Sequence, residues 1–492
     1  MVVGCTRPAH TAPYINFSQL GSPTQRTSDP SSPDPQSYLP PTREPDRPIQ
    51  TPTPSPPQPL PTLRAEEVTY IVRWGDTLKS IAERFRVLPR QISQVNDIEN
   101  PSLIYNGQRL IIPAPTLAEQ GPGFKIIPDS ELVYGPYTVH FDIPAVVDAW
   151  AGTLVDYQEE LDGRSYTGAE ILHRVAVEYS VNPRLLLAVL EHQSGWVTQT
   201  GGENEAYPLQ YREAGYEGLY RQLSWAANQL NRGYYLWRVR GVGGWMCQDG
   251  VNVPVDQTIN AGTAGVQHLF SQLTRHPGWL EAVSEEGLFA TYRDLFGYPF
   301  DYQYTPLIPA DLSQPNLQLP FEDDVVWAFT GGPHGGWGAG SAWAALDFAP
   351  PPGNQGCVQS EEWVVAAAAG EIVYADQGAV VQSINGDNYH QTGWTLLYMH
   401  IDSQDRVEPG TYLEVGDRIG HPSCEGGVST GTHLHLARRY NGEWIPADQH
   451  LPFDLDGWVS QGAGSPYQGS LVRGEVFLQA EDHRTDVNLI HR

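Results

Sequence analysis

The sequence predicts a multidomain chain in which a small βααβ module, an all-α domain and an antiparallel β-sheet domain follow one another. The 492 residues correspond to roughly three domains at about 150 residues each. The apolar pattern changes along the chain, from short strands around two helices, through helical periodicity, to β-branched runs separated by glycine turns. The hydrophobic share of 40% is sufficient for packed cores.

Charge and composition exclude several classes of protein. Lys and Arg number 29 against 57 Asp and Glu, giving a net charge of −28, so we expect no nucleic-acid partner, because nucleic-acid binding needs a basic surface. The longest apolar run is far shorter than the ~18 residues of a membrane span. Four cysteines are too few for a disulfide-dense scaffold.

The first segment, residues 1–64, holds 16 of the 42 prolines and predicts a disordered, extended tether. Its start, Val2-Val3-Gly4-Cys5, resembles the lipobox of bacterial lipoproteins, in which the cysteine carries lipid. The resemblance implies a membrane lipid anchor through Cys5. The alternative is a chance Gly-Cys pair at a terminus.

Residues 68–114 predict the βααβ module. Asp76 is a candidate N-cap for a helix whose apolar residues recur at helical spacing from Leu78 to Phe85. Pro89 can open a second helix that ends at Asn96, and a turn and a closing strand follow.

The motifs "YIVRWGDTLKSIAERF" and "NPSLIYNGQRLIIP" of this module strongly resemble a LysM module, a family that binds N-acetylglucosamine-containing glycans such as peptidoglycan. The resemblance implies that two loops line the glycan groove. Their residues are Gly75, Asp76, Thr77, Leu78, Ile104 and Gly107. The alternative is a structural domain without a ligand.

Residues 135–310 predict the all-α domain. Residues 169–179 form an amphipathic pattern, Asn182-Pro183 is a cap followed by proline at the first helical position, and residues 184–193 are apolar on most faces and predict a buried central helix.

The run "GAEILHRVAVEYSVNPRLLLAVLEHQSGW", with "NAG" at 260–262, resembles lytic transglycosylases and goose-type lysozymes. That family has a Glu directly before Ser-Gly, where this chain has Gln193. An amide cannot donate the proton that glycoside cleavage needs, and Glu191 lies about 200° round the helix. The resemblance therefore implies an inactive lysozyme-like domain. Glu203 or Glu205 is a less favoured substitute for the acid, and a helical spacer without glycan contact is the alternative.

Residues 320–475 predict the antiparallel sheet and contain the informative histidines. His433 and His435 lie two residues apart in a strand-like run, so both face the same side of a sheet. His334 follows a Gly-Gly-Pro turn, Asp347 stands in the run "ALDFAP", and His400 ends "GWTLLYMH". Two His and one Asp with an open position would make a catalytic zinc site.

The motifs "FTGGPHGG…SAWAALDFAP", "GWTLLYMH" and "GGVSTGTHLHL" resemble the lysostaphin/LytM-type zinc endopeptidases, in their β-lytic or LasA-like branch. Most of the wider family has a His where this chain has Trp343, but the β-lytic branch takes that ligand from an upstream Gly-Gly-x-His loop. The resemblance implies one Zn²⁺ bound by His334, Asp347 and His435 and a catalytic pair formed by His400 and His433.

The resemblance implies a zinc metalloendopeptidase that hydrolyses peptide stems or cross-bridges of peptidoglycan through metal-activated water, outside the cell or in its envelope. The alternative is a non-catalytic LysM/LytM envelope lipoprotein that activates a wall amidase or anchors to peptidoglycan. We also expect a disulfide between Cys357 and Cys424, because both lie in this domain and an oxidising exterior favours the bond.

Overall fold

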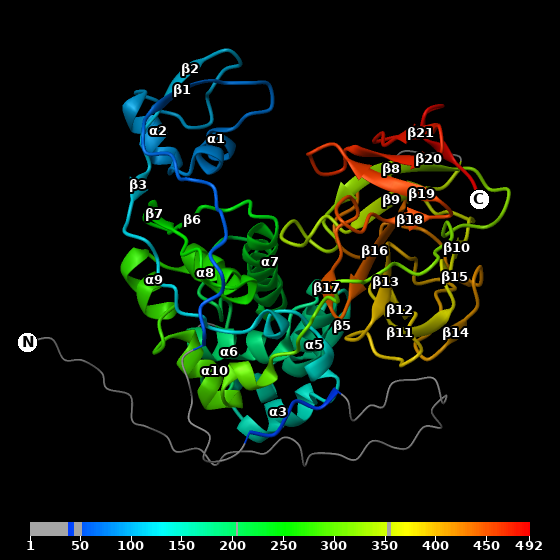
Figure 1. Cartoon of the computed structure of the whole chain (residues 1–492), viewed down its shortest axis with the longest axis horizontal. Coiled ribbons are helices and arrows are strands. Elements are labelled where there is room, and N and C mark those ends of the chain that lie inside the picture. The colour runs from blue at the N-terminus through cyan, green and yellow to red at the C-terminus, as the bar shows by residue number, and fades with distance from the viewer. Residues whose placement is uncertain (1–37, 44–51, 203–204, 352–355) are drawn as a thin grey trace, which may run out of the picture.

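The computed structural model describes residues 38–43, 52–202, 205–351 and 356–492. A small module, a mainly helical domain and a β-sheet domain follow one another along the chain (Figure 1), which confirms the predicted multidomain organisation. In Figure 1 the small module lies above the helical domain and the β-sheet domain lies beside it. Within the described residues, no helix combines the length and apolar character needed to span a membrane.

The small module has the predicted βααβ order. Strand β1 (Val68–Ile71) pairs antiparallel with β2 (Arg109–Ile112), and helices α1 (Leu78–Phe85) and α2 (Pro89–Val95) lie between them in the chain. Apolar residues from all four elements form its core.

The cap of α1 differs from the prediction. Thr77, not Asp76, is the N-cap, because Thr77 and Ser80 form a reciprocal capping box. Asp76 closes the preceding turn instead, accepting hydrogen bonds from the Tyr70 hydroxyl at 2.7 Å and the Arg73 backbone N–H at 2.8 Å. Asp76 is a strong N-cap residue in general, but here the better-placed hydroxyl of the next residue takes that role.

The helical domain is built around α5 (Gly168–Tyr179), α6 (Pro183–Ser194), α7 (Leu219–Arg238) and α8 (Ala261–Leu273). The first two confirm the predicted helices, and Asn182 caps α6 as expected. The remaining α-helices are α3 (Ile143–Trp150), α4 (Thr153–Asp156), α9 (His276–Ala282) and α10 (Leu288–Phe296), with 3₁₀ turns at η3 (Asp129–Glu131), η4 (Pro136–Thr138) and η5 (Pro299–Tyr302).

The prediction that this domain is all-α is not confirmed, because short strands border the helices. They are β3 (Thr116–Leu117), β4 (Gln158–Leu161), β5 (Arg164–Thr167), β6 (Gly244–Met246) and β7 (Val251–Pro254). They form one hairpin and one three-stranded sheet. Strands of two to four residues are too short to produce a period-two pattern that the sequence could have revealed.

The C-terminal domain is built on a nine-stranded antiparallel sheet, as predicted. Eight strands follow the spatial order β14 (Tyr412–Leu413), β11 (Gly370–Asp376), β12 (Ala379–Ser383), β13 (Trp394–Met399), β16 (Leu434–Tyr440), β9 (Ala345–Ala349), β8 (Trp327–His334) and β22 (Leu489–Ile490). The ninth, β17 (Glu443–Trp444), pairs with β16.

Two smaller sheets complete this domain. They comprise β10 (Val364–Val365) with β15 (Arg418–Gly420), and the series β18 (Asp454–Leu455), β19 (Trp458–Gly462), β20 (Gly469–Arg473) and β21 (Val476–Gln479). Because β21 and β22 follow residue 475, the β-sheet domain extends beyond the predicted boundary.

The two faces of the large sheet are buried against different partners. Val381, Leu397 and Ala437 belong to the same apolar core as the helical domain, whereas the neighbouring Val380, Leu396 and Leu436 pack into a second core of the β-sheet domain. This alternation follows from the period of two along a strand. The helical domain therefore covers one face of the sheet.

Residues 52–64 of the proline-rich segment lie along the helical domain (Figure 1). The backbone N–H groups of Ser55 and Gln58 donate to the carbonyls of Thr258 and Gln257, at 2.8 and 3.0 Å. The prediction of a disordered tether is therefore wrong for residues 52–64. An extended proline-rich chain leaves few N–H groups, and the helical domain provides acceptors for two of them. Cys5 lies outside the described residues.

Candidate metal centre

Three adjacent strands bring His334, Asp347 and His435 together. His334 is the last residue of β8, Asp347 is central in β9, and His435 stands directly opposite Asp347 in the antiparallel register of β16 and β9. All three side chains are buried. Within the described part of the chain, this is the single cluster of three His, Cys, Asp or Glu residues with the geometry of a metal site.

The ligand atoms of these residues form a nearly equilateral triangle. His334 Nε2 lies 3.0 Å from His435 Nδ1, and each lies 3.2 Å from Asp347 Oδ1. Ligand atoms of a tetrahedral Zn²⁺ site, each about 2.0–2.1 Å from the ion, stand about 3.3 Å apart. The triangle therefore has the size of one face of a zinc coordination tetrahedron.

Hydrogen bonds fix which imidazole nitrogens can bind a metal. His334 Nδ1 lies 2.8 Å from the Gly332 carbonyl, and His435 Nε2 lies 3.0 Å from the Gly336 carbonyl. A carbonyl only accepts, so these two nitrogens carry the protons and the nitrogens facing Asp347 carry lone pairs.

The centre therefore collects two lone pairs and a carboxylate oxygen in a buried space. Among the described residues, Asp347 Oδ1 has no hydrogen-bond partner of normal geometry. Such a group is unfavourable unless a cation or a proton lies between the three atoms. The residues present thus fit a divalent metal ion.

Burial and the charges of neighbouring side chains shift the pKa values of the three residues. Burial alone would raise the pKa of Asp347, but the neighbouring His334 and His433 hold it well below its usual range. Burial disfavours the charged form of His334, yet the Asp347 carboxylate outweighs this effect and raises the pKa of His334. The pKa of His435 is lowered, chiefly by burial.

His400 and His433 lie beside the triangle. Their ring centroids are 4.4 Å apart, and His433 Nε2 is 3.7 Å from Asp347 Oδ1. His400 Nδ1 donates to the Glu425 carbonyl at 2.9 Å and His433 Nδ1 to the Gly431 carbonyl at 2.8 Å. Each therefore keeps a proton-accepting lone pair at Nε2. The pKa of His400 is lowered to about 3, mainly by burial and then by His433 and His435, so this ring is neutral at ordinary pH.

A cleft of about 1140 Å³ opens onto these histidines. Tyr467 forms part of its wall, and its ring stacks on His334 with centroids 4.2 Å apart. Trp337 and Tyr179, the latter from the helical domain, line another part of the wall. Sequence reasoning missed these aromatic residues, because the wall is assembled from distant segments without a common motif.

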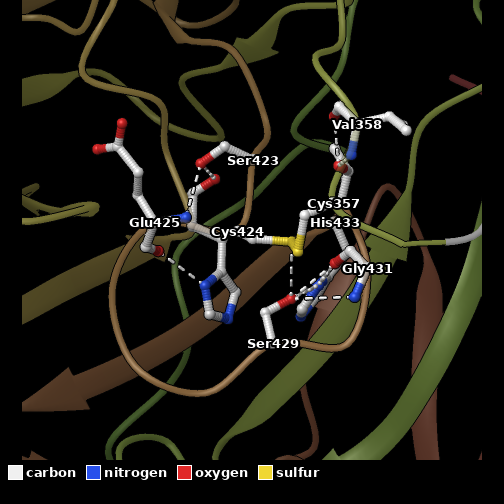
Figure 2. The surroundings of a disulfide bond; sticks show 10 residues. Cys357, Val358, Ser423, Cys424, Glu425, Ser429, Gly431 and His433 are labelled. Atoms are coloured by element: carbon white, nitrogen blue, oxygen red, sulfur yellow. Dashed lines mark hydrogen bonds between the residues drawn. A yellow bond between two sulfur atoms is a disulfide. The ribbon is translucent and has the colours of Figure 1, made fainter.

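A disulfide between Cys357 and Cys424 confirms the predicted pair, and Cys247 is buried and forms no disulfide with the other described cysteines. Figure 2 shows this disulfide near Glu425 and Gly431, whose carbonyls accept hydrogen bonds from His400 and His433. Glu425, whose carbonyl accepts from His400, follows Cys424 directly. Ser429 lies within hydrogen-bond distance of both Cys424 Sγ, at 3.5 Å, and His433 Nδ1, at 3.3 Å.

In the small module, the six predicted groove residues lie in or beside two loops. Gly75 and Gly107 have φ values of +86° and +82°, which only glycine adopts readily, so both make tight turns. The Leu78 side chain is buried in the core, however, and the Asp76 carboxylate is engaged by Tyr70 and Arg73. Trp74, which sequence reasoning missed, is 92% exposed beside Gly75.

In the helical domain, Gln193 lies in the last turn of α6. Glu191 points to the loop after this helix, where it accepts hydrogen bonds from the backbone N–H groups of Val197 and Thr198 at 3.0 and 3.1 Å and from the Thr198 hydroxyl at 2.7 Å. The Glu191 carboxylate is thus occupied by structural contacts.

Three family models match the chain: "LysM domain" over residues 70–113, "LasA, N-terminal domain" over 125–309 and "Peptidase family M23" over 342–446. His334 lies upstream of the third match.

Curated relatives include Protease LasA of Pseudomonas aeruginosa, 26% identical over 335 residues, 64% of this chain and 74% of that protein. The beta-lytic metalloendopeptidase of Achromobacter lyticus is 28% identical over 165 residues, 32% of this chain and 41% of that protein. The N-acetylmuramoyl-L-alanine amidase XlyA of Bacillus subtilis is 46% identical over 71 residues, 14% of this chain and 24% of that protein.

Two solved structures are similar in part. The M23 metalloprotease pseudoalterin from the deep sea has a TM-score of 0.29 at 22% identity and covers 37% of this chain and all of its own. A zinc-containing peptidase from Vibrio cholerae has a TM-score of 0.21 at 19% identity and covers 28% of this chain and 41% of its own.

The fold and the site define a metallopeptidase domain in a chain that also carries a small βααβ module. The chain carries a LysM domain, a LasA-type N-terminal domain and a C-terminal domain that belongs to peptidase family M23. The predicted activity is thereby confirmed: the chain is a metalloendopeptidase that acts on peptidoglycan.

Proposed function

We propose that the metal is a single Zn²⁺ held by His334, Asp347 and His435, and that the bond cleaved is a peptide bond in stems or cross-bridges of peptidoglycan. The observation that carries this proposal is the buried triangle of two nitrogens and one oxygen, 3.0–3.2 Å on each side, without a proton donor between them. When bound, the ion lowers the pKa of a water molecule and polarises the scissile carbonyl.

His400 and His433 are the proton-transfer residues of this proposal. Because both hold their Nδ1 protons on carbonyls, each presents Nε2 as an acceptor. One of them takes a proton from the attacking water, and the imidazolium so formed donates a hydrogen bond to the oxygen on which negative charge develops. The proton then passes to the leaving amine, so no covalent enzyme intermediate is required.

The experiment that tests the proposal measures metal content and peptide release together. The purified wild-type chain should hold one equivalent of zinc and release peptides with new amino termini from cell walls. His435→Ala should lose both metal and activity, whereas His400→Ala should keep the metal and lose activity. His450→Ala, at an exposed residue, is the matched control. A wild-type chain that binds no metal would leave only the alternative of a non-catalytic wall-binding or amidase-activating protein.

For the small module we propose binding of N-acetylglucosamine-containing glycan at the loops around Gly75 and Gly107. The exposed Trp74 supports this, since an aromatic side chain beside a turn can pack on a sugar ring. Trp74→Ala should weaken sedimentation of the chain with purified cell walls while leaving hydrolysis of a short soluble peptide unchanged.

For the helical domain we propose a lysozyme-like ancestry without glycosidase activity. Gln193 has no acidic proton, and the Glu191 carboxylate is occupied by backbone donors. Digests of cell walls should therefore contain new amino termini and no new reducing sugars. We further propose that the protein is located outside the cell or in the cell envelope. A lipid anchor at Cys5 stays a prediction.

A further inference from the structure

The loop of residues 335–344 joins two of the three proposed metal ligands, His334 and Asp347. It is closed internally, because the Gly336 N–H donates to the Ala342 carbonyl at 3.0 Å and the Trp337 N–H donates to Ser341 Oγ at 3.1 Å. These two hydrogen bonds connect the first and second halves of the loop.

The third proposed ligand depends on this loop as well. The Gly336 carbonyl accepts the Nε2 proton of His435 at 3.0 Å, and that hydrogen bond leaves the lone pair of His435 on Nδ1. Hydrogen bonds of this kind orient metal-binding histidines and select their tautomer. A displaced loop would release the His435 ring and move the end of β8 that carries His334.

The helical domain holds one side of the loop through Asn228 of α7. Asn228 Oδ1 accepts a hydrogen bond from the Gly340 N–H at 2.8 Å. The fit is close: a Cβ atom on Gly340 would lie 1.9 Å from the Asn228 carbonyl oxygen, and one on Gly338 would lie 2.7 Å from Asn228 Oδ1. The two glycines are thus required for this approach.

The other side of the 335–344 loop packs against Trp444 and Tyr179. Gly336 lies against the Trp444 ring, so that a Cβ there would be 2.5 Å from a ring carbon. The Trp444 indole N–H donates to the Tyr179 carbonyl at 3.2 Å, at the end of α5. The Tyr179 ring also meets Trp337 edge to face, with centroids 6.2 Å apart.

We propose that Asn228 is a positioning residue for the metal centre, acting from the helical domain through the 335–344 loop and the Gly336 carbonyl on His435. In this chain the helical domain then provides a contact that helps to position the metal centre. This inference rests on the proposed metal-binding role of His334, Asp347 and His435.

The test uses full-length Asn228→Ala and the matched control Gln229→Ala, at the next residue of α7, which forms no hydrogen bond with the described residues of the loop. Zn²⁺ affinity is measured by competition with a chromogenic chelator, and the absorption spectrum of the Co²⁺-loaded protein reports ligand geometry. Direct partners of metal ligands contribute about 10- to 100-fold to metal affinity, and Asn228 acts one step further away, so we expect Asn228→Ala to weaken Zn²⁺ binding by up to about 10-fold. The same variant should alter the Co²⁺ spectrum and lower kcat with KM little changed.

Two further variants separate positioning from general instability. Asn228→Asp keeps an acceptor for the Gly340 N–H and should restore Zn²⁺ affinity. Asn228→Leu keeps a side chain of similar size but has no acceptor for the Gly340 N–H, so it should behave as Asn228→Ala does. It also serves as the test variant if Asn228→Ala fails to fold. Wild-type Zn²⁺ affinity, Co²⁺ spectrum and kcat in folded Asn228→Leu would overturn the inference. A wild-type chain without Zn²⁺ would instead overturn the proposed function.

Discussion

Arg238, at the end of α7, forms an ion pair of 2.7 Å with Glu443 of β17, across the boundary between the helical and peptidase domains. Glu443 is buried and also accepts a hydrogen bond from the Tyr234 hydroxyl at 3.0 Å. Burial raises the pKa of Glu443, and the Arg238 charge opposes that rise. The carboxylate therefore depends on the other domain for its ionised form.

Arg238→Met should destabilise the chain by about 2 kcal/mol, because it leaves a buried carboxylate without its cation. The loss stays below that of a fully buried pair, since the Arg238 side chain is 41% exposed and water can replace part of the interaction. Urea unfolding measures the effect. Adding Glu443→Gln to Arg238→Met should recover part of the loss, and Arg240→Met, at an exposed position, should have no effect. If Arg238→Met is as stable as wild type, the Arg238–Glu443 ion pair does not stabilise the chain.

Removal of the disulfide by Cys357→Ser with Cys424→Ser should lower both stability and turnover. The bond closes a segment of 67 residues, for which the chain-entropy model gives about 4 kcal/mol. Turnover should fall because the carbonyls that accept from His400 and His433 belong to Glu425, directly after Cys424, and to Gly431 in the same loop. Peptide release and thermal unfolding measure the two effects, and Cys247→Ala is the control. Full turnover in the double variant would mean that the histidines are held without the bond.

The sequence was sufficient for elements with a strong local signal. The apolar faces of α5 and α6, with Asn182 as cap, predicted both helices, and the β-branched runs predicted the antiparallel sheet. It was insufficient where tertiary contacts decide. The two- to four-residue strands of the helical domain have no period of their own. Residues 52–64 look disordered because their backbone partners, at 257 and 258, lie about 200 residues away in the chain.

The candidate site likewise contains residues that the sequence predicted and surroundings that it did not. His334, Asp347, His400, His433 and His435 stand in short motifs, so the sequence predicted them and the structure brings them together. The surroundings of these residues have no local signal. Asn228 and Tyr179 belong to helices whose apolar periodicity indicates packing alone, and only the folded chain places them on the loop beside the metal centre.

Chelation should destabilise the peptidase domain. A ligand present at about 1,000 times its dissociation constant stabilises the folded state by about 4 kcal/mol. Differential scanning calorimetry with and without a chelator should therefore show a lower unfolding temperature after metal removal. Asp347→Asn, which lacks the carboxylate charge, should unfold at the same temperature under both conditions. An equal response of Asp347→Asn and wild type to the chelator would place the metal elsewhere.

Stability should fall in mild acid because of His268 in α8. The ring is buried, both of its nitrogens lack a hydrogen-bond partner within the described residues, and burial, with Arg232 and Arg86, lowers its pKa to about 3. In the unfolded chain the pKa is about 6.5. Below pH 6.5 the unfolded state binds a proton that the folded state does not, so stability is lost as pH falls from about 6.5 toward 3.

The contribution of His268 is about 1.4 kcal/mol for each pH unit in that interval. His268→Phe keeps a planar ring of similar size, which can still pack on Trp245, and removes the titration. Urea unfolding at pH 7 and pH 5 should thus show a smaller loss of stability in His268→Phe than in wild type. His450→Phe, at an exposed position, should keep the wild-type pH dependence. If His268→Phe loses as much stability as wild type between the two pH values, the unpartnered ring is not the origin of the acid sensitivity.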